Sequence, residues 1–172
     1  MERTIDWEVM PEDLAAADLA SPVAPPVLPL GESEPIRVNW VVEPPGRHSG
    51  GHTTVFRVVR YLEAHGYINR IYFYNPHMGD HAYFKRIARD YYSLTCPIDD
   101  VRDGMTDAHA VVATAWQTAY PVFNARSAGK RFYFAQDYEP YFYPRGSNTV
   151  FAENTYRMGF HGITAAGGWP RS

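Results

Sequence analysis

The sequence predicts an α/β fold in which a Rossmann-like parallel sheet carries helices on both faces. Short apolar runs typical of buried strands alternate with amphipathic segments of helical period, the pattern of parallel strands joined by right-handed crossovers. The first apolar run, at residues 36–42, leads through a glycine-rich turn into a helical segment. This arrangement presents backbone N–H groups to a ligand at the carboxyl edge of a sheet.

The first strand–helix unit has the clearest pattern. Residues 36–42 have apolar side chains on both faces of the expected strand, as in a strand covered on both sides. The helix expected after Gly51 has an apolar stripe at helical spacing, formed by Val55, Val58, Val59 and Leu62. Gly66 follows as the expected left-handed residue after the helix.

The later elements follow in order. Further strands are expected at residues 71–74, 110–114, 131–135 and 162–165, whereas residues 93–109 are expected to be loop-like, with a possible short strand at residues 92–95. Asp80 is the expected N-cap of the second helix. The third helix is expected to begin at Thr118, which places Pro121 in its first turn. Ser147 is expected to cap a fourth helix that ends at Gly159.

The chain divides into an acidic arm and a folded domain. Residues 1–34 contain eight acidic residues, one basic residue and five prolines, which indicates an extended arm or linker with a possible short helix at residues 11–20. Residues 35–172 form the expected Rossmann-like domain, with fifteen basic and eleven acidic residues. This mild positive charge fits an anionic small molecule and is too weak to indicate a nucleic-acid partner.

Several classes of protein are disfavoured by composition. The one cysteine, Cys96, excludes an internal disulfide framework and is interpreted as an apolar filler. No apolar run approaches the ~20 residues that span a bilayer, and the acidic N-terminus does not resemble a signal peptide. We therefore expect a cytoplasmic protein. Because the chain stops just after a strand, we expect it to be one half of a two-domain protein.

The glycine-rich turn at residues 46–53 resembles a P-loop but has His52 where the pattern requires lysine. This disfavours nucleotide hydrolysis. Gly50 and Gly51 are expected to face a phosphate or a sugar hydroxyl; the alternative is that they only permit a tight turn. The histidines show no metal-ligand spacing, so no metal site is expected.

Two further segments follow predicted strands at the same edge of the sheet. Trp116 comes after residues 110–114, and its ring fits a stacking platform for a sugar as well as it fits a core position. Gln136, Asp137, Tyr138 and Glu139 come after residues 131–135. Carboxylates among aromatic rings are typical of sugar binding or general-base catalysis; the alternative is a packed loop whose acids cap backbone N–H groups.

These segments together resemble a known family. The stretches VNWVVEPP and SGGHTTVFRVVRYLEAHGY, with YFAQDYEPYFYPRGS and AENTYRMGFHGITA later in the chain, resemble the N-terminal half of GT-B glycosyltransferases of the WsaF-like rhamnosyltransferase type, in the retaining family 4 class. The resemblance implies a two-domain enzyme whose N-terminal half holds the acceptor. The donor-binding C-terminal half, with its paired glutamates, is absent from this sequence.

The resemblance also implies roles for particular residues. The turn with Gly50, Gly51 and His52 would face the donor phosphates or the acceptor, with Thr53 and Arg57 on the helix behind it. The acceptor wall would be formed by Trp116, Thr118, Gln136, Asp137, Tyr138 and Glu139. No catalytic residue is assigned. The implied donor is dTDP-rhamnose without a cofactor, and the implied partner is a glycan or lipid-linked glycan acceptor, used at the inner face of a membrane.

Two hypotheses of different kinds remain open at this point. In the first, the chain is the acceptor-binding half of a glycosyltransferase that builds a surface glycan and is inactive without its donor half. In the second, it is a stand-alone sugar- or nucleotide-binding module without catalysis.

Overall fold

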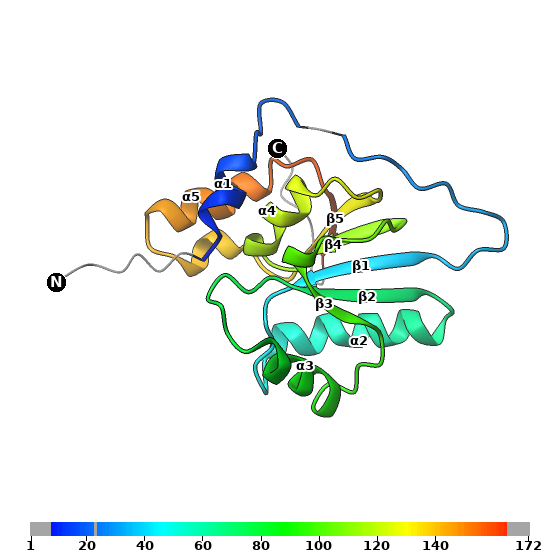
Figure 1. Cartoon of the computed structure of the whole chain (residues 1–172). Helices are drawn as coiled ribbons and strands as arrows, with labels where there is room; N and C mark the ends of the chain where they lie inside the picture. The colour runs from blue at the N-terminus through cyan, green and yellow to red at the C-terminus, as the bar shows by residue number, and fades with distance from the viewer. Residues whose placement is uncertain (1–7, 23, 165–172) are drawn as a thin grey trace.

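The computed structural model describes residues 8–22 and 24–164. In this part of the chain six parallel strands form one sheet in the order β3-β2-β1-β4-β5-β6 (Figure 1). The strands are β1 (Arg37–Val42), β2 (Ile68–Phe73), β3 (Ile98–Asp100), β4 (Ala110–Ala113), β5 (Lys130–Ala135) and β6 (His161–Thr164). The helices are α1 (Pro11–Ala16), α2 (Gly50–Ala64), α3 (His81–Asp90), α4 (Trp116–Asn124) and α5 (Ser147–Thr155), with short 3-10 turns η1 (Val101–Asp103) and η2 (Glu139–Phe142). The predicted α/β fold class is confirmed.

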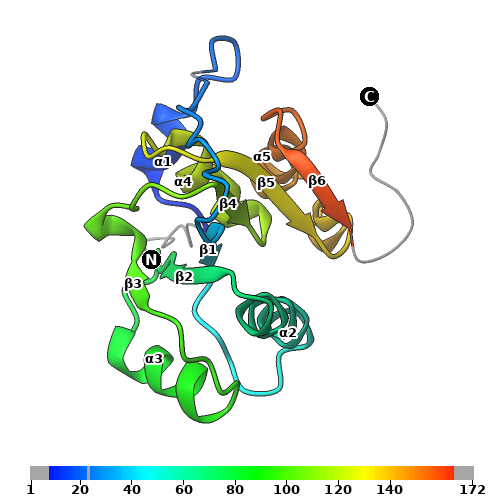
Figure 2. The same cartoon turned by 90° about the vertical axis from the view of Figure 1, so that its right-hand side faces the viewer.

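The helices cover the two faces of the sheet. Helices α2 and α3 lie on one face, and α1, α4 and α5 lie on the other (Figures 1 and 2). Strand β1 sits between β2 and β4, with Trp40 opposite Ile71 on one side and Val112 on the other. Because β1 is covered on both faces, all but its first residue are buried, as the apolar side chains on both faces of the predicted strand indicated.

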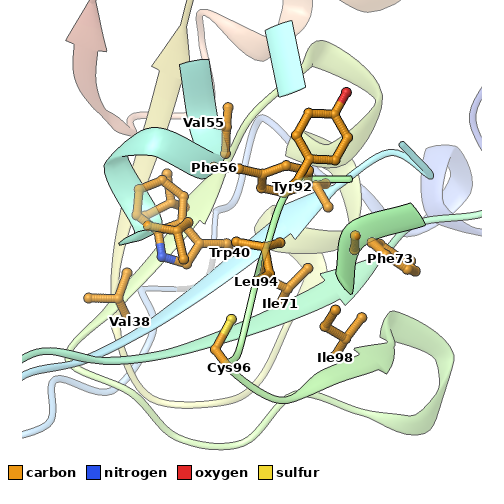
Figure 3. Packing of buried hydrophobic residues seen from close by; sticks show 14 of the residues in the cluster. Val38, Trp40, Val55, Phe56, Ile71, Phe73, Tyr92, Leu94, Cys96 and Ile98 are labelled. Carbon is orange, nitrogen blue, oxygen red and sulfur yellow. The ribbon is translucent and has the colours of Figure 1, made fainter. Parts of the chain in front are cut away.

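The core under α2 and α3 is built around large side chains from the centre of the sheet (Figure 3). Phe56 of α2 packs edge-to-face on Tyr92, with ring centroids 4.9 Å apart. The indole N–H of Trp40 donates to Asn69 Oδ1 at 2.8 Å, and the Asn69 amide donates to the carbonyl of Val59 at 3.3 Å. These bonds satisfy the polar atoms that would otherwise be costly to bury.

The ends of α2 follow local rules that are visible in the sequence. Ser49 caps its first turn, and Val55 and Val59 of the predicted stripe are buried. At the other end, Gly66 has φ 84°, in the left-handed region that favours glycine. The N–H of Tyr67 bonds to the carbonyl of Leu62, and that of Gly66 to the carbonyl of Glu63, which is the Schellman arrangement.

One strand prediction is wrong. Residues 92–95 do not form a strand, because the amides of Ser93 and Leu94 bond back to α3 and Ser93 adopts φ 56°. The edge strand forms directly after Pro97 instead, as β3, where the prediction placed a loop. Leu94 therefore packs into the core from a turn rather than from a strand.

Two predicted helix starts are also wrong. Helix α4 begins at Trp116 rather than Thr118, since Glu139 from a distant turn accepts from the Trp116 amide. Pro121 therefore lies in the second turn. Helix α5 has Gly146 at its N-cap, with Ser147 already helical and no side-chain cap.

The first described residues of the acidic arm, residues 8–14, pack against the domain. Val9 is 2% exposed and belongs to the core under α4 and α5. The amide of Met10 donates to the Tyr74 hydroxyl at 2.8 Å, and Asn124 donates to the carbonyl of Asp13 at 2.8 Å. The helix allowed for at residues 11–20 forms as α1.

Candidate functional site

A pocket of about 380 Å³ lies where the strand order reverses, between β1 and β4. The loops that leave these two strands diverge to opposite faces of the sheet, which opens a crevice at the carboxyl edge. The β1–α2 connection lines the pocket with Glu43, Ser49, Gly51 and His52. Residues 114–115 line it after β4, and Gln136, Asp137, Glu139 and Phe142 line it after β5.

His52 holds the β1–α2 loop in place. Its Nε2 lies 3.0 Å from the carbonyl oxygen of Glu43, so Nε2 carries the proton and donates. Its Nδ1 lies 2.8 Å from the Ser49 hydroxyl, which donates to it. Burial lowers the pKa of His52, which keeps the ring neutral in this tautomer. Both ring nitrogens are therefore used to join the end of β1 to the start of α2.

Glu139 is a fixed, buried carboxylate. One oxygen accepts from the backbone N–H of Trp116 at 2.9 Å, and the other accepts from the Tyr133 hydroxyl at 2.8 Å. Burial raises the pKa of Glu139, while these two hydrogen bonds act in the opposite direction. The side chain links β5, η2 and the start of α4.

Glu43 is the carboxyl group with the most perturbed titration in the pocket. Burial is the main cause, and the nearby charges of Glu139 and Glu8 add to it, so the pKa of Glu43 rises to about 7. No hydrogen bond from a described residue is made to its side-chain oxygens. Near neutral pH this carboxyl can therefore both accept and donate a proton, the property expected of a general base or acid.

On the side of the pocket formed by the segment after β5, a side chain lies close to the backbone of α2. The carboxamide of Gln136 lies so near Gly51 that a Cβ there would be 3.3 Å from its nitrogen. Next to it, one oxygen of Asp137 accepts from the Tyr138 amide at 2.7 Å, and the side chain is exposed. Phe142 is 62% exposed and supplies an apolar surface at the rim.

Several residues proposed from the sequence lie in the core or beside the pocket. Trp116 is 1% exposed, and its indole N–H donates to the Tyr143 hydroxyl at 3.0 Å, an arrangement that corresponds to the core alternative. Thr118 is fully buried, where its hydroxyl accepts from the amides of Thr114 and Ala115. Four more of the residues proposed from the sequence do not line the pocket: Gly50, Thr53, Arg57 and Tyr138.

The sequence reasoning did not single out Glu43, Ser49, Thr114 or Phe142. A usable signal existed for Glu43, which directly follows the first predicted strand and so had to lie at the carboxyl edge. No comparable signal existed for Phe142, because the turn η2 is what brings its side chain over the pocket.

The lining suits a hydroxyl-rich ligand better than a phosphate. Three carboxyl groups and a carboxamide converge on the pocket, and none of the described residues that line it is a lysine or an arginine. Ionised carboxylates accept hydrogen bonds and repel anions, whereas a sugar offers hydroxyl donors. Among the described residues no group of three His, Cys, Asp or Glu side chains has the arrangement of a metal site.

A larger cavity, of about 540 Å³, lies at the other edge of the sheet. It is bounded by residues 24–27 and by the first residues of β5 and β6, and its walls are mainly apolar. Ligands of open parallel sheets bind at the carboxyl edge, so the smaller, polar pocket is the candidate site. In the described part of the chain, no helix is long and apolar enough to cross a bilayer.

Comparison with known proteins gives one local similarity. No family model matches the chain. Over 52 residues the chain is 52% identical to the O-antigen biosynthesis protein RfbC of Myxococcus xanthus. The matched segment is 30% of this chain and 4% of that much longer protein.

Proposed function

We propose that this domain binds the acceptor sugar for a glycosyltransferase that extends a surface glycan. The observation that supports this most strongly is the pocket at the sheet's switch point, where carboxyl groups converge and no described residue of the lining is a lysine or an arginine. The proposed donor is a nucleotide sugar, dTDP-rhamnose, presented by a second domain of the GT-B type. The proposed acceptor is a glycan, free or linked to a lipid.

The pocket chemistry gives each residue a role in this proposal. Asp137 and Gln136 hydrogen-bond to sugar hydroxyls, and Phe142 packs on an apolar face of the ring. Glu43 orients the acceptor hydroxyl and takes up its proton as the new glycosidic bond forms, while the bond between the donor sugar and its diphosphate breaks and dTDP leaves. Glu139 and His52 are positioning residues that fix the two sides of the pocket.

The local similarity supports the same assignment. The relative is named for O-antigen biosynthesis, and O-antigens are surface glycans. The parallel sheet with its site at the carboxyl edge is the architecture on which a GT-B half is built. Together these observations favour a glycan-building enzyme over a nucleotide hydrolase.

The proposal is tested by saturation-transfer NMR with methyl α-L-rhamnopyranoside and dTDP as separate probes. The variants are Asp137→Asn and Phe142→Ala, with Glu153→Gln on the exposed face of α5 as the control. We expect saturation of the glycoside by the unmodified protein and by the control, and at least a several-fold weaker signal in both pocket variants. Tight binding of dTDP with no glycoside signal would contradict the proposal and favour a nucleotide-binding module.

A further inference from the structure

A second, smaller pocket lies on the other side of the β1–α2 loop. Its volume is about 180 Å³, and it is lined by Arg47 from the loop and by Tyr83, Arg86, Ile87, Asp90 and Tyr91 from α3 and its end. Figure 2 shows this loop passing close to the end of α3 before α2 begins. The volume is below the range of whole small-molecule sites, so it fits a charged group rather than a complete ligand.

The loop is held against α3 by specific contacts. The Tyr92 hydroxyl donates to the carbonyl of Gly46 at 2.6 Å, and the Tyr91 hydroxyl lies 2.7 Å from Nδ1 of His48. The rings of His48 and Tyr91 also pack edge-to-face at 5.1 Å. His48 has φ 63°, which a residue other than glycine rarely adopts. These contacts maintain that turn and so define the position of Arg47.

The two arginines are free to bind an anion. Neither Arg47 nor Arg86 forms an ion pair or donates a hydrogen bond to any residue in the described part of the chain. The Arg86 guanidinium lies over the Tyr83 ring, 5.7 Å from its centroid, which orients its N–H groups. Planar guanidinium groups bind phosphate oxygens through paired hydrogen bonds. Among the described residues that line this pocket, Asp90 is the acidic one.

The two pockets share one loop. Ser49 lines the acceptor pocket and Arg47 lines the arginine pocket, and two residues of chain span at most ~7 Å. A ligand that crosses this loop, with a sugar on one side and a phosphate group on the other, would contact both linings. Carboxyl groups would meet its hydroxyls, and arginines would meet its anionic part.

We propose that Arg47 and Arg86 bind the diphosphate group of a glycosyl diphosphate acceptor whose sugar occupies the neighbouring pocket. This inference rests on the proposed function and specifies the class of its acceptor. It places the phosphate beside Arg47 rather than on the glycine turn. Asp90 limits the affinity because it adds a negative charge beside the anion.

The test is isothermal titration of the complete chain with inorganic pyrophosphate in a buffer without other phosphate. We expect binding that weakens by about tenfold in Arg47→Gln and in Arg86→Gln, the effect of losing a charged hydrogen bond. Asp90→Asn should tighten it by about threefold. Arg60→Gln, on the exposed side of α2, is the matched control and should leave the affinity unchanged.

Further probes separate the possible sources of the phosphate. Geranyl diphosphate should compete with pyrophosphate, as a lipid-linked diphosphate requires. Equal affinity in the double variant Arg47→Gln/Arg86→Gln, or an equal loss in Arg60→Gln, would overturn the proposal. Binding to phosphatidylglycerol vesicles that depends on both arginines yet persists in saturating pyrophosphate would also overturn it, and would indicate a membrane surface.

The two proposals fail in different ways. Loss of glycoside binding with normal pyrophosphate binding would contradict the acceptor-sugar function alone. Normal glycoside binding in a protein that does not bind pyrophosphate would contradict the diphosphate site alone.

Discussion

Glu43→Gln should make the protein more stable at pH 8. Burial and the nearby charges of Glu139 and Glu8 raise the pKa of Glu43 from 4.5 to about 7. A tenfold change in proton affinity corresponds to about 1.4 kcal/mol, so the ionised carboxylate destabilises the folded state by about 3 kcal/mol. Glutamine has nearly the same shape and no charge, and it removes this cost.

The sign depends on pH. At or below pH 4 the carboxyl is largely protonated in both the folded and the unfolded chain, so it has little effect on stability. As the pH rises from about 4.5 to 7, the unfolded chain loses this proton before the folded one does, and the free energy of unfolding falls. Above pH 8 the full cost of about 3 kcal/mol is present.

Thermal unfolding followed by circular dichroism between pH 4 and 8.5 measures the effect. For a chain of this size, about 3 kcal/mol corresponds to a rise in Tm of roughly 6–12 °C at pH 8. The two proteins should have nearly equal Tm at pH 4, and Glu153→Gln should follow the unmodified protein throughout. Parallel pH curves for Glu43→Gln and the unmodified protein would refute this reasoning. A carboxyl group with such a cost is more easily explained by function than by stability.

Three further substitutions test buried hydrogen bonds and the cap of α2 by urea denaturation. Thr118→Val should lower the free energy of unfolding by about 3 kcal/mol, because it leaves two buried amides without an acceptor; a loss below 1 kcal/mol would contradict this. Ser49→Ala should cost about 1 kcal/mol through loss of the cap of α2, and an unchanged midpoint would show that the cap contributes nothing. Arg131→Met should cost about 3 kcal/mol, since its buried guanidinium donates to four carbonyls, and a neutral effect would show that water satisfies them.

The sequence predicted the fold where local rules determine it. The alternation of apolar strands and amphipathic helices predicted a parallel sheet, and the glycine after α2 predicted its end. The errors occur where distant residues decide. Helix α4 starts at Trp116 because Glu139, 23 residues away, caps it. The strand after α3 was misplaced because the apolar Tyr92 and Leu94 reach the core from a turn.

The position of the candidate site could be predicted from the sequence, but only some of the residues that line it could be. Residues that follow strands in a parallel sheet must meet at one edge, so Gly51, Gln136 and Asp137 were found to line one pocket. Which side chains face the pocket depends on packing that single segments do not reveal. Trp116 turns into the core, and Phe142 takes the exposed position at the rim.

The most direct test of the central claim is a map of where a sugar binds. Amide chemical shifts of the ¹⁵N-labelled chain are recorded while methyl α-L-rhamnopyranoside is added. The account predicts that the shifts that change cluster at Gly51, Ala115 and Gln136, around the pocket between β1 and β4. Changes confined to Phe123 and Lys130, in the apolar cavity at the opposite edge of the sheet, would contradict it.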